Sequence, residues 1–354
     1  MLPQSGEPAP WFTAPTPSNP QFVFDTAAGR YVLMAFLPLG TDAASGAAMR
    51  RLADSLAMFD DRRLSAFVVT RDPQTAASAR DLRGLRWFLD LDGAVSRLYG
   101  AVESDGKEAP GWLLLDPMLR VIFAAPLSDA GSVFERLSAL PAPADHAGAP
   151  TPAPVLIAPR VFDPDLCAQL IAMHEADGGR FTGVMRDDGD RTRAVMDPLK
   201  RRRDVLIREP SLLAEVGERL RRALFPAIEK ALGFSATRVE RHVVSCYDAS
   251  DEGVFHAHRD STTFATEHRR FACSINLNDD FEGGDLRFPE FGPQTYRPPI
   301  GGAVVFSCAL MHEATQVTAG RRFAFLPFLH DEAGATVLAD YQRRVGLRQE
   351  TASQ

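Results

Sequence analysis

The chain has 354 residues, an apolar content of 45% and a formal net charge of −7 at pH 7. This length suits two globular domains, each with enough apolar residues to bury a core. The negative charge argues against a general binder of nucleic acid or of anionic membranes, so neither is an expected partner. No apolar run reaches the roughly 18 residues that a membrane span requires.

The beginning of the chain and its cysteines predict a cytoplasmic protein. Residues 1–7 contain neither the basic nor the apolar segment of a secretory signal. None of the cysteines has C-x-x-C spacing, so we expect reduced and mostly buried thiols. These cysteines are Cys167, Cys246, Cys273 and Cys308.

The first part of the chain alternates apolar runs with a helical pattern. Such alternation predicts an α/β sheet with crossover connections. We expect strands at residues 29–37, 64–70, 112–115 and 119–123, and a helix at residues 43–59.

Proline and alanine then alternate without periodicity over residues 141–154, which predicts an extended linker. The linker separates a first domain, residues 1–140, from a second, residues 155–335. Residues 336–354 are expected to form a C-terminal tail.

Three segments of the first domain resemble peroxiredoxins, a branch of the thioredoxin fold. Gly6–Phe12 resembles the opening of that family, Phe36–Thr41 the approach to its peroxidatic loop, and Phe88–Gly100 a later segment. The resemblance implies a thioredoxin-like fold, but Ala44 and Ser45 stand where the peroxidatic cysteine belongs. A serine cannot replace the thiolate nucleophile in peroxide reduction. We therefore predict a non-catalytic domain, and partner docking, substrate presentation and homodimer formation remain open as its role.

The second domain begins with helical patterns and continues with short strands. Asp163 and Pro164 form a helix start, and Ser211–Leu232 keeps apolar residues at helical spacing. Residues 271–277 alternate between apolar and polar side chains, which predicts a half-buried strand. Further short strands at residues 285–288 and 303–306 are separated by turn residues. The pattern predicts a double-sheet antiparallel jelly roll with buttressing helices.

Within this domain, residues 200–203 form a run of four basic side chains, Lys-Arg-Arg-Arg. We interpret the run as a solvated surface, with phosphate or substrate binding as the alternative.

Two histidines and an aspartate have the pattern of a mononuclear iron site. His258 and Asp260 are two positions apart, so on an extended strand they would point to the same face. His312 follows an apolar run and can provide a third ligand from a neighbouring strand. Two imidazoles and one carboxylate leave coordination positions open, as in non-haem Fe(II) oxygenases. The alternative is that these side chains lie on the surface and bind no metal.

Arg322 follows His312 in the next apolar segment and can present a planar guanidinium beside the metal. Such a group binds a carboxylate through two parallel hydrogen bonds. Its neighbour Arg321 should face the opposite side of the strand.

These residues, together with Tyr247, Gly253 and residues 281–289, resemble the prolyl 4-hydroxylase-like branch of the Fe(II)- and 2-oxoglutarate-dependent dioxygenases. The resemblance implies that His258, Asp260 and His312 bind iron. It also implies that Arg322 binds the distal carboxylate of 2-oxoglutarate and that Tyr247 adds a hydrogen bond to it. Many members carry lysine where this chain has Arg322, and either cation suits a carboxylate.

The expected activity is hydroxylation of an aliphatic C–H of an amino-acid-like or peptidyl, proline-like substrate. Fe(II), 2-oxoglutarate and O₂ would be required, with ascorbate as an optional reductant, and succinate and CO₂ released. The alternatives are a scaffold built on two inactive folds and an oxygenase of other outcome, such as a desaturase or halogenase. The carboxylate of Asp260 favours hydroxylation over halogenation, because a halide would need its coordination place.

Overall fold

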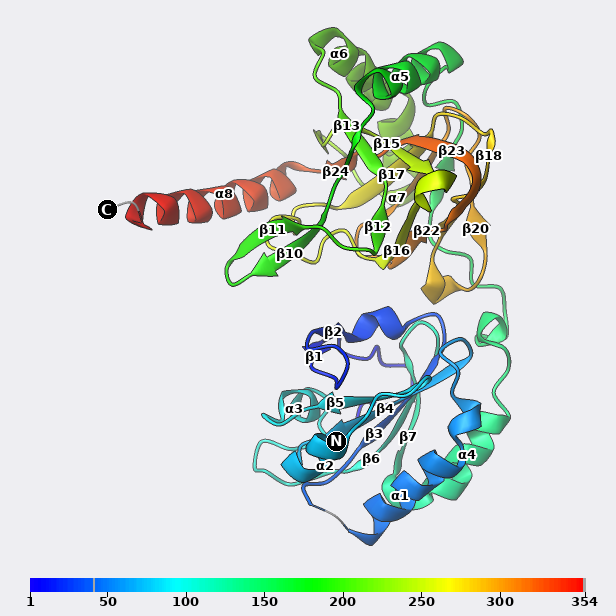
Figure 1. Ribbon diagram of the computed structural model, residues 1–354, viewed down its shortest axis with the longest axis vertical. Coiled ribbons are helices and arrows are strands. Elements are labelled where there is room, and N and C mark those ends of the chain that lie inside the picture. The colour runs from blue at the N-terminus through cyan, green and yellow to red at the C-terminus, as the bar shows by residue number, and fades with distance from the viewer. Residues whose placement is uncertain (41, 353–354) are drawn as a thin grey trace. The chain divides into compact units, whose positions relative to one another are not determined.

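The computed structural model describes residues 1–40 and 42–352, with side chains described as far as residue 346. The chain divides into two compact units (Figure 1). The first comprises residues 1–152 with 289–293, and the second comprises residues 153–288 with 294–354. The division after residue 152 falls inside the segment expected to be a linker. Thr41, which belongs to the peroxiredoxin-like segment, lies outside the described residues.

The first unit is built on a five-stranded mixed sheet in the order β5-β4-β3-β6-β7. Strands β3, β4 and β5 are parallel, whereas β6 and β7 run antiparallel. This is the strand arrangement of a thioredoxin-like fold, as predicted. The bounds are Tyr31–Phe36 (β3), Leu64–Thr70 (β4), Leu85–Leu89 (β5), Gly111–Leu115 (β6) and Val121–Pro126 (β7), with a separate hairpin of β1 (Thr13–Ala14) and β2 (Phe22–Val23).

Helices cover this sheet, and every residue of its central strands is buried. The predicted helix at residues 43–59 ends earlier than expected, at Asp54, and a 3₁₀ turn continues it. The strand β5 was not among the predicted elements. The helices are α1 (Ala43–Asp54), α2 (Pro73–Ser78), α3 (Ala94–Leu98) and α4 (Ala130–Ser138).

Ser45, at the position expected for a peroxidatic cysteine, caps helix α1. The Asp42 side chain accepts a hydrogen bond from the Ser45 N–H at 2.6 Å, and the Ser45 hydroxyl accepts one from the Asp42 N–H at 3.0 Å. This reciprocal capping box satisfies two backbone donors that the first helical turn leaves open. Ser45 therefore has a structural role in the capping of α1.

The second unit contains two antiparallel sheets, the jelly-roll arrangement that the short strands predict. The minor sheet has the order β12-β16-β22-β19-β20, and the major sheet has the path β14-β24-β17-β23-β15-β13-β9, to which β8, β18 and β21 are added. Minor-sheet strands are Lys200–Arg201 (β12), Val254–His258 (β16), Leu286–Arg287 (β19), Thr295–Tyr296 (β20) and His312–Ala314 (β22). Major-sheet strands are Leu156–Ala158 (β8), Arg180–Phe181 (β9), Arg203–Leu206 (β13), Arg238–Glu240 (β14), Val243–Asp248 (β15), Phe271–Asn276 (β17), Phe281–Gly283 (β18), Ala303–Ser307 (β21), Val317–Phe325 (β23) and Phe328–His330 (β24).

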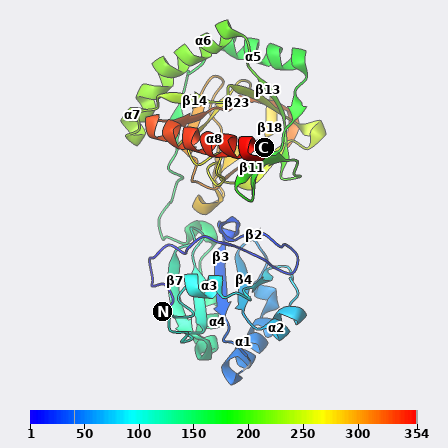
Figure 2. The same cartoon turned by 90° about the vertical axis from the view of Figure 1, so that its left-hand side faces the viewer.

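Three helical segments pack on the outer face of the major sheet (Figure 2). Helix α5 (Pro164–Asp177) begins as predicted, with the Asp163 carboxylate accepting from the Leu166 N–H. Helix α6 (Pro210–Arg219) passes through a π turn into α7 (Phe225–Leu232). Their apolar faces meet alternate residues of the sheet in one core, so their buttressing role is confirmed.

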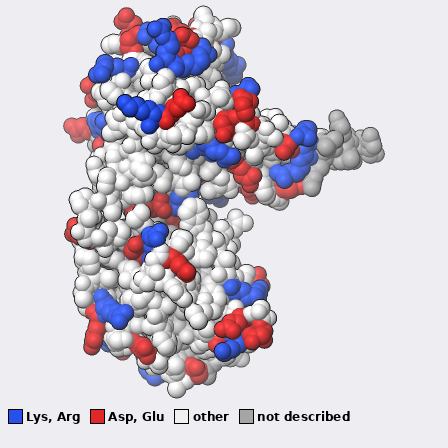
Figure 3. All heavy atoms as spheres, turned by 180° about the vertical axis from the view of Figure 1, so that it is seen from behind, with Lys and Arg blue, Asp and Glu red and all other residues white. Residues whose placement is uncertain are grey.

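Two elements of the second unit were not predicted. Strands β10 (Val184–Asp188) and β11 (Arg191–Val195) form a separate hairpin, and α8 (Glu332–Ala352) is a long helix that includes most of the expected tail. The Tyr341 hydroxyl accepts a hydrogen bond from the Thr192 N–H at 3.0 Å, so α8 contacts the hairpin. Charged residues of both signs lie side by side on the face in Figure 3. Among the described residues, no helix is long and apolar enough to cross a membrane.

The structure predicts that the four thiols react slowly. Cys167, Cys246, Cys273 and Cys308 are all free and buried, and burial raises the pKa of Cys167 to about 11 and that of Cys246 to about 12. Because the thiolate is the reactive form, native protein should react with Ellman's reagent far more slowly than protein in denaturant. Rapid modification of a native thiol, or thiol-dependent peroxide turnover, would contradict this assignment.

Candidate metal centre

The structure brings the three predicted ligands together at one end of a pair of antiparallel strands. His258, the last residue of β16, pairs directly with His312, the first residue of β22. Asp260 Oδ1 lies 3.6 Å from His258 Nε2, and Oδ2 lies 3.2 Å from His312 Nε2. One ligand atom from each residue lies within 4.8 Å of the others, which is the spacing of a shared metal ion.

The local geometry differs from the predicted strand. The strand β16 ends at His258, so Asp260 lies beyond it and is not on the same extended segment. The Asp260 N–H donates to the Cys308 carbonyl at 3.0 Å. A main-chain bond from the neighbouring segment, and not strand periodicity, therefore positions the carboxylate.

Both imidazoles use Nδ1 for a backbone contact and leave Nε2 for a ligand. His258 Nδ1 lies 2.7 Å from the His256 carbonyl, and His312 Nδ1 lies 3.1 Å from the Leu310 carbonyl. A carbonyl only accepts, so each Nδ1 carries the proton and each Nε2 presents a lone pair towards Asp260. This orientation is the one that metal-binding histidines adopt, so the residues fit a divalent metal.

The surroundings of His258 and Asp260 favour the protonation states that a metal requires. Burial, followed by repulsion from His312, lowers the pKa of His258 to about 4, which keeps this imidazole neutral near pH 7. Burial alone would raise the pKa of Asp260. The attraction of His312 and the hydrogen bond with His258 have a larger, opposite effect and hold that pKa well below its usual value. A neutral imidazole and an ionised carboxylate are the metal-binding forms.

Arg322 is a buried cation whose hydrogen bonds go to neutral groups. Its side chain donates to Ser274 Oγ at 2.8 Å and to Asn276 Oδ1 at 3.0 Å, and the residue is 2% exposed. Burial lowers the pKa of Arg322. Arg321, the next residue, is exposed and pairs with Glu175 at 2.8 Å. The two arginines therefore lie on opposite sides of β23, as predicted.

Tyr247 lies beside Arg322 on the same face of the major sheet. The two residues are register partners on β15 and β23, and the Arg322 guanidinium carbon lies 5.5 Å from the Tyr247 ring centre. The Tyr247 hydroxyl accepts a hydrogen bond from Arg202 at 3.0 Å. Its own proton can therefore be donated to a ligand beside Arg322.

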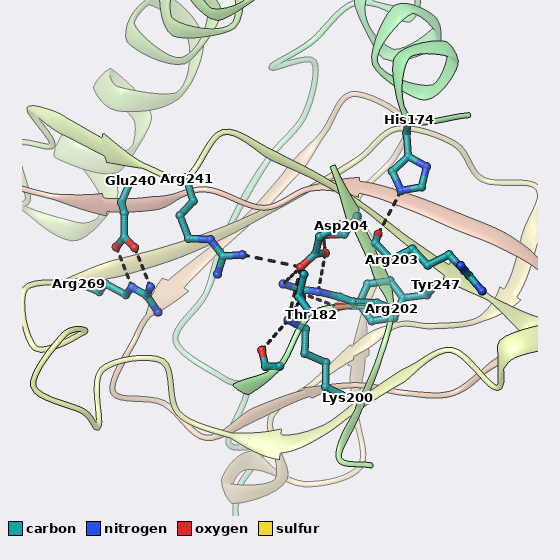
Figure 4. A network of polar contacts seen from close by, with 12 residues as sticks. His174, Thr182, Lys200, Arg202, Arg203, Asp204, Glu240, Arg241, Tyr247 and Arg269 are labelled. Atoms are coloured by element: carbon teal, nitrogen blue, oxygen red, sulfur yellow. Dashed lines mark hydrogen bonds and ion pairs between the residues drawn. The ribbon is translucent and has the colours of Figure 1, made fainter. Parts of the chain in front are cut away.

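Two features of the site were predicted wrongly. Strand β17 is not half-buried, because its polar residues Ser274 and Asn276 are also buried and bind Arg322. The basic run is not a solvated surface either: Lys200 and Arg202 are 6% and 8% exposed and surround Asp204 (Figure 4). Four consecutive basic residues carry no local sign of this burial, because distant parts of the chain cover Lys200 and Arg202.

A partly buried ion pair supports the segment that carries Asp260. Arg269 donates to both carboxylate oxygens of Glu240, at 2.8 Å and 2.7 Å, and to the Asp260 carbonyl at 3.3 Å. His268 Nε2 lies 2.8 Å from the same Glu240 carboxylate. The pair thus connects strand β14 to the backbone of a candidate metal ligand.

Comparison with known proteins supports the same region. Residues 242–330 match the family model described as the 2OG-Fe(II) oxygenase superfamily, so the second unit carries a 2OG-Fe(II) oxygenase domain. A PKHD-type hydroxylase of Verminephrobacter eiseniae is 28% identical over 124 residues, which cover 31% of this chain and 54% of the relative. The chain therefore spans about half the length of that curated relative.

Solved structures similar to the two parts belong to two different groups. A prolyl hydroxylase of Trichoplax adhaerens, in complex with a peptide fragment of hypoxia inducible factor, is 16% identical, with 58% of this chain and 94% of that chain covered and a TM-score of 0.42. The bacterioferritin comigratory protein of Xanthomonas campestris is 19% identical, with 36% of this chain and 90% of that chain covered and a TM-score of 0.31.

Replacing Glu240 by glutamine should destabilise the second unit in a pH-dependent way. Burial opposes ionisation, but the hydrogen bonds from Arg269 and His268 outweigh it and lower the pKa of Glu240 from 4.5 to about 2. Breaking a buried pair costs about 3–5 kcal/mol. Because the folded-state pKa is lowered, this stabilisation is present above pH 4.5 and is lost as the pH falls towards 2.

Urea unfolding of wild type and Glu240→Gln at several pH values measures this difference. The exposed pair of Glu332 with Arg238 provides the control, since Glu332→Gln should change the free energy of unfolding far less than Glu240→Gln does. Equal effects of the two substitutions at pH 7 would show that the Glu240 pair has no special role.

Proposed function

We propose that the second unit is an Fe(II)- and 2-oxoglutarate-dependent dioxygenase that hydroxylates an aliphatic C–H bond. The observation that carries the proposal is Arg322, a buried guanidinium with neutral partners on the strand that follows the His-Asp-His site. A buried cation of this kind is costly unless an anion joins it. The distal carboxylate of 2-oxoglutarate is that anion in this proposal.

Different residues would bind the metal and the cosubstrate. His258 Nε2, His312 Nε2 and an Asp260 oxygen would hold iron, which when bound supplies the activation of O₂. Arg322 would bind the distal carboxylate through parallel N–H groups, while the Tyr247 hydroxyl donates a further hydrogen bond to it. Succinate and CO₂ would be the coproducts.

Aromatic rings would shield this centre from water. Phe255 stacks on the His258 ring at 3.5 Å between centres, and the Phe306 ring lies 4.5 Å from that of His312. A dry, low-dielectric surrounding strengthens the electrostatic contacts to a bound ligand.

The proposed substrate is amino-acid-like or peptidyl, with a proline-like residue as the leading candidate. The curated relative is named a PKHD-type hydroxylase, which supports hydroxylation as the outcome. Asp260 supports the same choice over halogenation, because it occupies the place that a halide would need. Ascorbate would act as an optional reductant.

The first unit is proposed to be a non-catalytic accessory domain of a cytoplasmic protein. It contains no cysteine, since Cys167 is the first in the chain. Substrate recruitment and homodimer formation are the roles proposed for it.

The Asp260→Ala substitution should abolish turnover and weaken metal binding. It removes the one anionic ligand, so the charge of the dication is no longer partly neutralised. Anaerobic titration should give one Fe(II) per wild-type chain and weaker binding by the variant, with Asp279→Ala as an exposed-carboxylate control. Full 2-oxoglutarate turnover by Asp260→Ala would refute the ligand assignment.

The Arg322→Ala substitution should raise the 2-oxoglutarate concentration required for half-maximal succinate formation. Loss of a charge-assisted contact is worth about 1.5–3 kcal/mol, on the order of tenfold to a hundredfold. Arg321→Ala is the matched control and should change this concentration little, because its side chain faces Glu175. The reverse order of effects would contradict the proposed cosubstrate site.

A further inference from the structure

We infer that a group of buried and partly buried cations beside the metal centre is a second anion site, which holds a carboxylate group of the primary substrate. The group consists of Lys200, Arg202 and Arg241 around Asp204 and is called the basic cluster below (Figure 4). This inference rests on the proposed function and deepens it by naming a chemical feature of the substrate.

The basic cluster lies where the chain passes from one sheet to the other. Lys200 is on β12 of the minor sheet, Asp204 is on β13 of the major sheet, and Arg202 lies between these strands. Lys200 Nζ and the Arg202 guanidinium carbon lie 5.6 Å and 5.5 Å from the Phe255 ring centre. Because the same ring stacks on His258, one aromatic side chain contacts both the cluster and a candidate iron ligand.

Three cations share one carboxylate whose oxygens already have other partners. Asp204 accepts from Ser245 Oγ at 2.6 Å and from Thr182 Oγ1 at 2.5 Å, and lies 3.0 Å from Arg202 Nε. Lys200 and Arg241 approach it only to 3.4 Å and 3.7 Å. The cluster therefore has more buried positive charge than Asp204 neutralises.

Three further observations indicate that a ligand can bind the cluster. The buried Nε of Arg202 lies near Asp204 but has no aligned acceptor among the described residues. The Arg241 side chain is 31% exposed and so opens the cluster to solvent. Its backbone has a φ of 62°, a left-handed conformation that is uncommon for a residue with a side chain and that clusters at binding sites.

The electrostatic surroundings agree with an excess of positive charge. Burial and then repulsion from Arg202 lower the pKa of Lys200 to about 7 and also lower the pKa of Arg241. At Arg202, by contrast, the attraction of the Asp204 carboxylate is stronger than the effect of burial, so the pKa of that guanidinium is raised. An added anion would relieve the unfavourable surroundings of Lys200 and Arg241.

The basic cluster adjoins the proposed cosubstrate anchor but consists of different cations. Arg202 and Arg322 both lie against the Tyr247 ring, at 5.8 Å and 5.5 Å from its centre. Since 2-oxoglutarate would bind Arg322, the cations of the cluster are available to the other reactant, the primary substrate. A carboxylate matches the guanidinium donors, and an amino-acid-like substrate carries one.

Ligand-detected NMR on protein loaded with Mn(II) and N-oxalylglycine tests this inference, because Mn(II) broadens the signals of molecules bound near it. Calorimetry first establishes that both additions bind. The probes are acetate, N-acetyl-L-proline, the neutral amide of N-acetyl-L-proline, and inorganic phosphate. Zn(II)-loaded protein, which causes no such broadening, is the reference.

The two carboxylates should broaden saturably, whereas the amide should not and phosphate should bind more weakly. Arg241→Gln should raise the dissociation constants of the carboxylates about tenfold, corresponding to loss of one charge-assisted contact. Arg241→Lys should retain most of the affinity. Arg222→Gln removes the same charge from an exposed position of the helical region and should have no effect. Melting temperatures confirm that the variants are folded.

Equal broadening by the amide, tighter binding of phosphate, or equal weakening by Arg222→Gln would overturn the inference. So would the absence of carboxylate binding in protein that binds Mn(II) and N-oxalylglycine. Failure of those two additions to bind would instead contradict the proposed function and, with it, a substrate role for the cluster.

Discussion

The candidate site depends on the alternation of side chains along three adjacent strands of the major sheet. On β15, β17 and β23, every second residue enters the apolar core beneath the helices. The residues between them point to the other face and include Tyr247, Ser274, Asn276 and Arg322. A shift of one residue in any of these strands would exchange core and site. Packing of the helices therefore fixes the register that positions the cosubstrate anchor.

The same rigid framework holds charges that water would otherwise solvate. Arg322 and the basic cluster are buried with fewer anionic partners than cations, and burial of unpaired charge is costly. Anions that bind only the folded protein would recover part of this cost, so ligands should stabilise the second unit. The Glu240–Arg269 pair is different, because its charges are already matched and its contact with the Asp260 carbonyl is structural.

Much of this arrangement could be predicted from local sequence, and the failures have physical reasons. Residue type and spacing predicted His258, Asp260 and His312 as candidate ligands, and the structure brings these three side chains together. Local patterns could not show that helices and the second sheet cover both faces of β17, so its polar residues were expected to be in water. Lys200 and Arg202 were misinterpreted for the same reason, since burial of a basic run depends on strands distant in sequence.

The first domain shows the difference between noticing a missing residue and knowing the role of the residue in its place. The missing cysteine was evident from the sequence, whereas the capping role of Ser45 required the helix start to be seen. The pair of Glu240 with Arg269 joins distant segments and had no local signal.

Anaerobic absorption spectroscopy of the Fe(II)-loaded chain tests the central claim most directly. A 2-oxo acid that chelates Fe(II) produces a visible charge-transfer band, whereas glutarate, which lacks the keto group, cannot. The account predicts a saturable band with 2-oxoglutarate and none with glutarate. Protein that binds Fe(II) but develops no band with 2-oxoglutarate would contradict it.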